Sequence, residues 1–309
     1  MSTISENIGK ISGFDLSYVD SDSKVQNILT SALNKANLPA YVSIQGILWD
    51  ANYFGLNQVK YFTSATFSQQ QKILEIANRD LLEEIYWVEK AGVGYMSKMV
   101  ILAQSHEERL LYSLFSADEA THLATITPFL GEDTPMFKGD TFLSYMAKVI
   151  ESDDKLLLMI LVQVVLEGWG MTHYRSLGKH CLNPQFAEIL RGFLDAETRH
   201  HALGVTQVKE YGDYFSIESL KNIHCALTYF LQMIQVGPQR LLITIEKVLG
   251  YLSVKDKVQI LTELKTQEYS NIKLELLRSL MLGTVPNSII QSLEEQGAFQ
   301  AYSAVKCVK

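Results

Sequence analysis

Apolar residues recur along most of this chain every three or four positions, the spacing that places them on one face of an α-helix. The same stretches are rich in Leu, Ile, Met, Ala, Glu, Lys and Gln, which are good helix formers. The Asn-Gly and Asp-Gly pairs that mark tight β-hairpins do not occur. The pattern therefore predicts an all-α protein.

Helix start and stop signals divide this pattern into successive helices. Ser105 and Glu108 have the spacing of an N-terminal capping box, and Asn183-Pro184 places an N-cap before a proline in the first turn. Gly131 is a candidate C-cap because glycine accepts a positive φ. We expect helices at about 24–37, 68–103, 105–131, 141–177 (with a break at 151–155) and 183–212.

Two further long helices and one short helix follow, with starts at Ser216, Ser253 and Pro286 and an interruption at Gly237-Pro238. No linker or low-complexity tract separates them from the rest of the chain. We therefore expect a single domain over residues 1–309. In it, the helices at about 68–212 form a four-helix bundle, and the extra helices at about 216–298 pack against the bundle or build a dimer face.

Composition narrows the class of protein. Hydrophobic residues make up 47% of the 309 residues and charged residues 20%, which is enough apolar material for a sizeable core. The formal net charge is −7 and no Lys/Arg-rich run occurs, so we expect no nucleic-acid partner. The three cysteines form no Cys-x-x-Cys pair, which argues against a thiolate zinc site and fits a reducing compartment.

Neither a secretion signal nor a membrane span is expected. The N-terminal sequence MSTISENIGKISGFDLSYVD is polar and lacks the apolar centre of a signal peptide. The most apolar run, KLLLMILVQVVL, is shorter than the ~20 residues that a membrane span requires. We expect a soluble, cytoplasmic protein with no membrane partner.

Two Glu-x-x-His motifs, Glu119-x-x-His122 and Glu197-x-x-His200, lie in apolar stretches that are predicted to be helical. Residues three apart share one face of a helix, so each motif can direct a carboxylate and an imidazole at the same metal ion. One such motif alone is usually a solvated helix face. Two in apolar helices are not explained that way, because uncompensated charges are disfavoured there.

Each motif has a matching glutamate upstream. Glu89 lies thirty residues before Glu119, and Glu167 lies thirty residues before Glu197. Thirty residues fit half a helix, a short turn and half a helix, which brings the lone glutamate level with the motif on an antiparallel partner helix. Glu84 is an alternative to Glu89, but it breaks the equal spacing of the two halves.

The chain thus contains an internal repeat that supplies four carboxylates and two imidazoles. Oxygen and nitrogen donors of this kind suit iron or manganese, and two divalent cations would balance the four negative charges. We expect six metal ligands: Glu89, Glu119, His122, Glu167, Glu197 and His200.

This pattern resembles the ferritin-like di-iron carboxylate superfamily, whose signature is one Glu from each of two helices and Glu-x-x-His from each of the other two. The resemblance covers roughly residues 68–212. The extra helices and the equal spacing are similar to the oxygenase and oxidase branch, including aldehyde-deformylating oxygenases and bacterial hydrocarbon monooxygenases. Phe193 stands where arylamine N-oxygenases usually carry another histidine, and no rubredoxin-type cysteine pair is present.

The resemblance implies a non-haem di-iron oxygenase or oxidase that uses O2 to oxidise a small amino-acid-, amine- or fatty-derived substrate. It implies two Fe ions, with a Mn/Fe pair as an alternative, and an external electron donor such as a ferredoxin or reductase. A homodimer is compatible with it. The alternative functions are a ferroxidase or iron-handling protein, and a helical bundle that metals only stabilise.

Other polar residues near the ligands receive secondary roles. We expect Asp118 to accept a hydrogen bond from the histidine of the other half, and Arg199 to balance charge. His201 and His173 are expected to be peripheral.

Three glycines lie one turn beyond expected ligands: Gly92, Gly170 and Gly204. They either leave room beside the metals for dioxygen and substrate, or they allow close helix packing.

Overall fold

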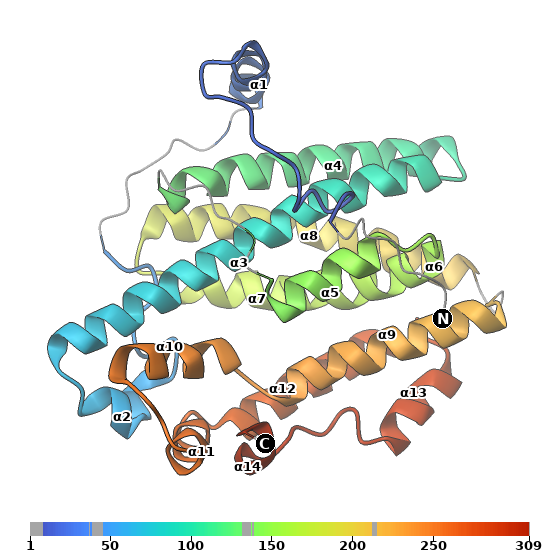
Figure 1. The fold of residues 1–309 in the computed structure, drawn as a ribbon. Helices are drawn as coiled ribbons and strands as arrows, with labels where there is room; N and C mark the ends of the chain where they lie inside the picture. The colour runs from blue at the N-terminus through green and yellow to red at the C-terminus, as the bar shows by residue number, and fades with distance from the viewer. Residues whose placement is uncertain are drawn as a thin grey trace. The chain divides into compact units, whose positions relative to one another are not determined.

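The computed structural model describes residues 9–36, 38, 46–131, 137, 139–211 and 215–308. Within these residues every regular element is helical and no strand is present, which confirms the all-α prediction (Figure 1). The expected helix ends at Asn37 and Gly212 lie outside the described residues. The finer prediction, a ferritin-like bundle, stays a prediction.

The chain divides into two compact units, each made of two separate segments. Unit 1 comprises Met1–Ile44 and Leu81–Leu158, and unit 2 comprises Gln45–Asp80 and Met159–Lys309. The long helix α3 (Phe67–Leu102) contributes its first part to unit 2 and the remainder to unit 1. The predicted single domain stays a prediction.

Unit 1 follows the expected helix order. Besides its part of α3, it contains α1 (Lys24–Lys35), α4 (His106–Ile126), η2 (Thr127–Leu130), α5 (Thr141–Ile150) and α6 (Lys155–Leu158). The break predicted at 151–155 is confirmed as a gap between α5 and α6. Gly131 ends η2 with a φ of +79°, as a glycine stop requires.

The start of α4 is confirmed, but its capping differs from the predicted box. The Ser105 side chain accepts a hydrogen bond from the Glu108 amide, as expected (3.0 Å). The Glu108 carboxylate accepts from the Gln104 amide instead of that of Ser105 (2.6 Å). The same carboxylate pairs with the Lys155 ammonium at 2.5 Å, and both side chains are nearly buried. This ion pair ties the beginning of α4 to α6.

The N-terminal segment packs on α3 within unit 1. Phe14 is buried and meets Trp87 edge to face, with ring centroids 5.0 Å apart. The Ile11 amide donates to Glu151 at 2.7 Å. A Cβ at Gly94 would overlap the Ile11 carbonyl, so glycine allows the backbone of this segment to approach α3 closely.

Unit 2 holds the helices that follow Met159. After the short η1 (Leu56–Gln58) and α2 (Lys60–Thr63) come η3 (Met159–Leu166), α7 (Glu167–His180), α8 (Pro184–Tyr211), α9 (Ile217–Gln235), α10 (Gln239–Leu249), α11 (Val254–Glu263), α12 (Thr266–Met281), α13 (Asn287–Glu295) and α14 (Ala304–Val308). Within this unit α9 and α12 lie side by side (Figure 1).

Most of these helix starts agree with the sequence signals. Asn183 caps α8, and the side chains of Ser216 and Ser253 cap α9 and α11. The helix predicted after Ser253 is not continuous, however. It stops at Glu263, and α12 begins at Thr266 after Lys265 adopts a left-handed conformation with φ 51°.

Lys155–His180 is one continuous helical stretch of 26 residues, in which η3 is a π-helix rather than an α-helix. By length and composition it could cross a membrane, so the prediction that this region is too short for a membrane span is wrong for the whole helix. Its most apolar window is 61% buried, and core helices of soluble proteins pass the same test. The helix is therefore consistent with a soluble protein.

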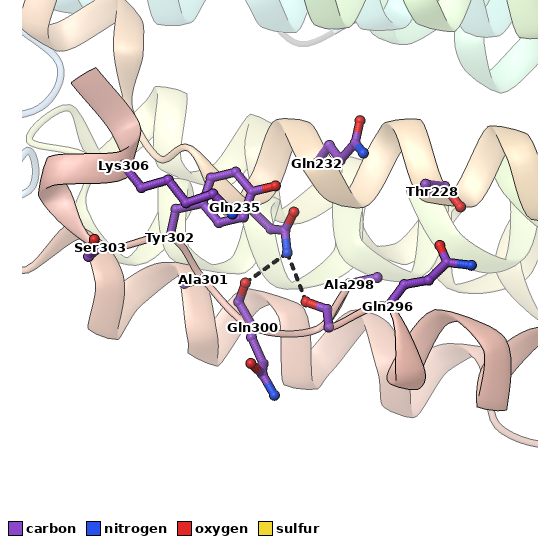
Figure 2. Close-up of a pocket in the computed structure, with 11 residues that line it drawn as sticks. Thr228, Gln232, Gln235, Gln296, Ala298, Gln300, Ala301, Tyr302, Ser303 and Lys306 are labelled. Carbon is purple, nitrogen blue, oxygen red and sulfur yellow. Dashed lines mark hydrogen bonds between the residues drawn. The ribbon is translucent and has the colours of Figure 1, made fainter. Parts of the chain in front are cut away.

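A polar cavity of about 330 Å³ lies between α9 and the C-terminal segment of unit 2 (Figure 2). The Gln235 amide fixes its wall by donating to the carbonyl oxygens of Gly297 (3.0 Å) and Gln300 (2.8 Å). The lining contains no His, Asp, Glu or Cys, and Lys306 is its charged residue. The lining therefore does not offer a metal site of the expected kind.

Asn78 is the polar centre of the N-terminal segment of unit 2. It is buried, and its Oδ1 accepts from the amides of Leu48 (2.9 Å) and Trp49 (2.8 Å). Its Nδ2 donates to the carbonyls of Trp49 and Leu74, both at 2.9 Å. One side chain thus satisfies four buried backbone groups.

We predict that Asn78→Ala lowers the free energy of unfolding by roughly 2–4 kcal/mol, because buried amides lose their acceptor. Urea unfolding followed by circular dichroism measures the change. Asn57→Ala, at an exposed position of η1, is the control and should change stability by about 0.5 kcal/mol or less. Equal stability of the two variants would contradict the role of Asn78.

Candidate metal sites

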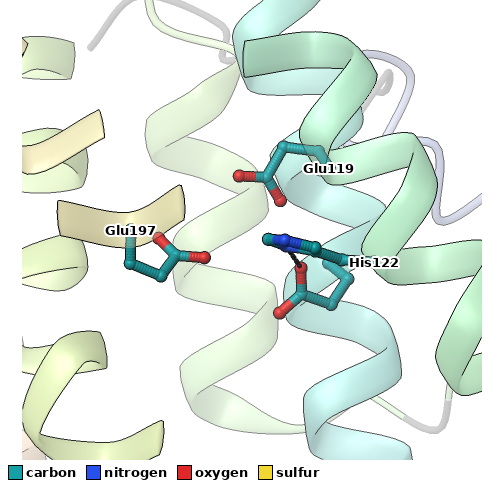
Figure 3. A group of neighbouring side chains, drawn as sticks. Glu119, His122 and Glu197 are labelled. Atoms are coloured by element: carbon teal, nitrogen blue, oxygen red, sulfur yellow. Dashed lines mark hydrogen bonds and ion pairs between the residues drawn. The ribbon is translucent and has the colours of Figure 1, made fainter. Parts of the chain in front are cut away.

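The first set of expected ligands comes together in unit 1. Glu89 lies on α3, and Glu119 and His122 lie on α4. All three are buried, and each offers a ligand atom within 4.8 Å of the others. The His122 Nδ1 is 3.0 Å from a Glu89 carboxylate oxygen. Figure 3 shows Glu119 and His122 leaving the same side of their helix, as the three-residue spacing predicts.

The second set comes together in unit 2. Glu167 is the first residue of α7, while Glu197 and His200 lie on α8, which packs along α7. Their ligand atoms also lie within 4.8 Å of one another. The His200 Nδ1 is 3.7 Å from Glu167 Oε2 and 3.6 Å from Glu197 Oε2. His200 and Glu197 are buried, and Glu167 is nearly so.

The separations within each set suit a bound cation. For metal–ligand bonds of about 2.1 Å, donors 3.0 Å apart subtend roughly 90° at the metal, and donors 3.6–3.7 Å apart subtend roughly 120°. Both angles are ordinary for transition metals bound by nitrogen and oxygen. Each Glu, Glu and His set can therefore hold one ion.

Electrostatics point the same way in unit 2. Burial raises the pKa of Glu167 well above its usual range, and the neighbouring Glu197 carboxylate raises that pKa further. His200 opposes both effects. Two carboxylates buried side by side repel one another, and a divalent cation between them would remove that repulsion.

The three glycines differ in what a side chain at their position would meet. A Cβ at Gly92 would overlap the Glu119 carboxylate, with the carboxylate carbon only 2.7 Å away, so this glycine makes room for an expected ligand. A Cβ at Gly204 would overlap the Gln163 side chain, so that glycine serves close helix packing. No atom lies within 4 Å of a Cβ placed at Gly170, so close helix packing does not account for that glycine, and its role in leaving room for dioxygen and substrate stays a prediction.

The structure also places the other candidates from the sequence. Glu89, and not Glu84, belongs to the unit 1 set. His201 Nδ1 donates to the Gln163 carbonyl at 3.0 Å. Arg199 is exposed and donates to the Asp195 carbonyl of its own helix at 3.2 Å.

Asp118 is half-buried on α4, and its hydrogen bond to a histidine of the other half stays a prediction. His173 packs beside the rings of Trp169 and Tyr174. Its burial lowers its pKa to about 4, and Lys273 acts in the same direction.

The sequence did not predict the π-helix η3 or the hydrogen bonds of Gln163. The Gln163 side chain donates to the backbone carbonyl of His200 at 3.1 Å. A single glutamine inside the apolar run MILVQVVL was the available signal, because a buried amide requires a partner.

Comparisons of the chain with protein-family models, with curated proteins and with solved structures give no match. The assignment of a function therefore rests on the residues and their geometry.

The repeat supplies a matched pair of variants. We predict that Gly92→Ala weakens binding of one metal ion by about 10- to 100-fold, because the new methyl group displaces Glu119. Gly170→Ala, at the equivalent position of the other half, should leave metal affinity unchanged and stabilise its helix by up to about 1 kcal/mol. Anaerobic titration with Fe²⁺ measures both affinities. Equal affinities would show that Glu119 does not bind metal at this position.

His173 should make stability depend on pH. Its pKa is lower in the folded protein (about 4) than in the unfolded chain (6.5), so the unfolded state binds the extra proton between these values. Stability is fully present above pH 6.5 and falls as the pH approaches 4, by up to about tenfold in the unfolding constant per pH unit.

We predict that His173→Gln flattens this part of the stability–pH curve, measured by urea unfolding between pH 4 and 7. The exposed His180→Gln is the control. Parallel curves for wild type and His173→Gln would contradict the assignment.

Proposed function

We propose that the two ligand sets together hold two iron ions and that the protein is a non-haem di-iron oxygenase or oxidase. One observation carries the proposal: each half of the repeat gathers the same three residue types, Glu, Glu and His, with ligand atoms within 4.8 Å of one another in each set. The equal thirty-residue spacing in the sequence supports the same role, one bound ion, for each half.

The donor types favour iron or manganese. Carboxylate oxygen and imidazole nitrogen fill both sets, and no cysteine takes part in either. Two divalent ions would carry the four positive charges that the four glutamates require. Because both sets offer the same donor types, a mixed Mn/Fe pair fits them as well as two Fe ions.

Bound iron would supply the activation of O2 and the oxidation of an organic substrate. The chain's own residues would orient the ions, neutralise their charge and exclude water. Large buried side chains lie close to the ligands in sequence: Tyr86 and Met96 on α3, Tyr112 and Phe115 on α4, and Phe193 on α8. Such surroundings favour a small apolar or amphipathic substrate, of amino-acid, amine or fatty origin.

The remaining parts of the proposal follow from the sequence. No flavin or nicotinamide fingerprint is present, so electrons would come from a separate ferredoxin or reductase. A cytoplasmic location fits the scattered cysteines.

Anaerobic titration with Fe²⁺, followed by rapid mixing with oxygenated buffer, tests the proposal. We predict saturation at two ions per chain, with a transient visible absorption band and consumption of O2 after mixing. Uptake far beyond two ions would identify an iron-handling protein. Saturation with no O2 consumption, together with a melting temperature that rises on metal binding, would identify a metal-stabilised bundle.

Paired variants show whether each set holds one ion. The double variants Glu119→Ala/His122→Ala and Glu197→Ala/His200→Ala should each retain a single ion per chain. Unchanged stoichiometry in both would refute the ligand assignment.

A further inference from the structure

Gln163 is a fully buried polar residue in the middle of an apolar π-helix. The other seven residues of η3 are apolar, and all but the last of them are buried. In a π-helix each carbonyl bonds the amide five residues ahead, so one extra residue enters the turn compared with an α-helix. Such turns are rare in proteins. Those that do occur are often found at functional sites. In this chain the turn comes immediately before Glu167, an expected ligand.

The Gln163 side chain reaches the adjacent helix α8 next to another expected ligand. Its Nε2 donates to the backbone carbonyl of His200 at 3.1 Å. In a regular α-helix that carbonyl faces the amide of Gly204, four residues ahead. A Cβ at Gly204 would overlap the Gln163 side chain, so the glycine opens the space that this hydrogen bond needs.

A second hydrogen bond runs in the opposite direction. The His201 Nδ1 donates to the Gln163 carbonyl at 3.0 Å. In a π-helix that carbonyl faces the amide of Gly168, five residues ahead. A Cβ at Gly168 would lie 2.9 Å from the His201 ring, so this glycine opens the space for the imidazole.

Two reciprocal hydrogen bonds therefore join η3 to α8, and we call this pair of bonds the clasp. On each side a backbone carbonyl accepts a hydrogen bond from a side chain of the other helix. A glycine four or five residues after that carbonyl leaves space for the side chain. One bond ends on His200 itself, and the other starts at the residue after it. Glu167 lies four residues after Gln163. The clasp thus connects the π-turn before one expected ligand to the helix turn that carries another.

We infer that Gln163 and His201 are positioning residues that hold Glu167 in place relative to Glu197 and His200. Without the clasp, η3 can shorten to an α-helical turn, and a shift of one residue rotates Glu167 by about 100° around its helix. The inference rests on the proposed function, because it concerns the same metal ligands. It adds two residues that touch no metal and that determine the affinity of one of the two sets.

Anaerobic titration of the 309-residue protein with Co²⁺ tests this inference, because bound cobalt has a visible spectrum that reports its coordination. We predict that Gln163→Leu lowers the binding affinity for one of the two Co²⁺ ions by about 10- to 100-fold and changes the spectrum of that ion. The other ion should keep its affinity, because the Glu89, Glu119 and His122 set is untouched. The melting temperature of the metal-free protein serves as a measure of purely structural damage.

Two variants of His201 make the test independent of Gln163. His201→Phe keeps a ring over Gly168 but cannot donate to the Gln163 carbonyl, so it should show the same selective loss. His201→Gln can donate and should restore affinity and spectrum. If Gln163→Leu fails to fold, this pair still decides the question.

The outcomes separate the inference from the proposed function. Two ions bound by wild type, with wild-type affinity and cobalt spectrum in both Gln163→Leu and His201→Phe, would overturn the inference alone. A loss of affinity for one ion in His201→Phe that is also seen in His201→Gln would overturn the inference as well. In that case the hydrogen bond would not be the cause of the loss. A wild-type protein that binds no metal would overturn the proposed function and the inference with it.

Discussion

The burial of ionisable side chains is the constraint on which the rest of this structure depends. Glu89, Glu119 and Glu197 are removed from water almost completely, as are both histidines of the two sets. An isolated charged carboxylate strongly destabilises a folded protein when it is buried. Its charge must therefore be cancelled, or it must keep its proton. Burial and the neighbouring Glu197 raise the pKa of Glu167, which favours the second solution at that residue. Bound metal ions would provide the first.

The two halves of the repeat solve the same problem with different local structures. In unit 1 a histidine bonds the lone glutamate directly, at 3.0 Å, and Gly92 leaves space for the Glu119 carboxylate. In unit 2 the histidine stands farther from both carboxylates, and a π-helix precedes the lone glutamate. Two ions bound by the same residue types would therefore not be equivalent. Such a difference allows the ions to differ in affinity and in reduction potential.

The sequence predicted those features that depend on short-range rules. Asn183, Ser216 and Ser253 begin helices because their side chains satisfy free amides, and this chemistry is local. The spacing of three residues placed Glu119 beside His122, and the spacing of thirty placed Glu89 level with them, because helix geometry is regular. The all-α class followed from the same regularity.

The features that the sequence did not predict depend on partners distant in the chain. Nothing in MILVQVVL distinguishes a π-helix from an α-helix, and the residues that η3 contacts, Gly204 and His201, lie on α8, far along the chain. The turn between α11 and α12 places Lys265 in a left-handed conformation, and no glycine at that position signals it in the sequence. Glu108 bonds Gln104 and Lys155 rather than closing the predicted capping box, because an ammonium from α6 competes for its carboxylate.

The interleaved course of the chain has a consequence for its synthesis. Unit 1 requires residues from both sides of the segment 45–80, and that segment belongs to unit 2. A ribosome that releases the chain from its N-terminus therefore delivers part of unit 2 before unit 1 is complete, and this part waits until residues beyond 159 emerge. The apolar residues of 45–80, including Trp49 and Leu56, are exposed to solvent or to chaperones during that interval. No single cut in the chain separates one whole unit from the other. Neither half of the ligand repeat can therefore be produced as a complete unit from one continuous segment of the chain.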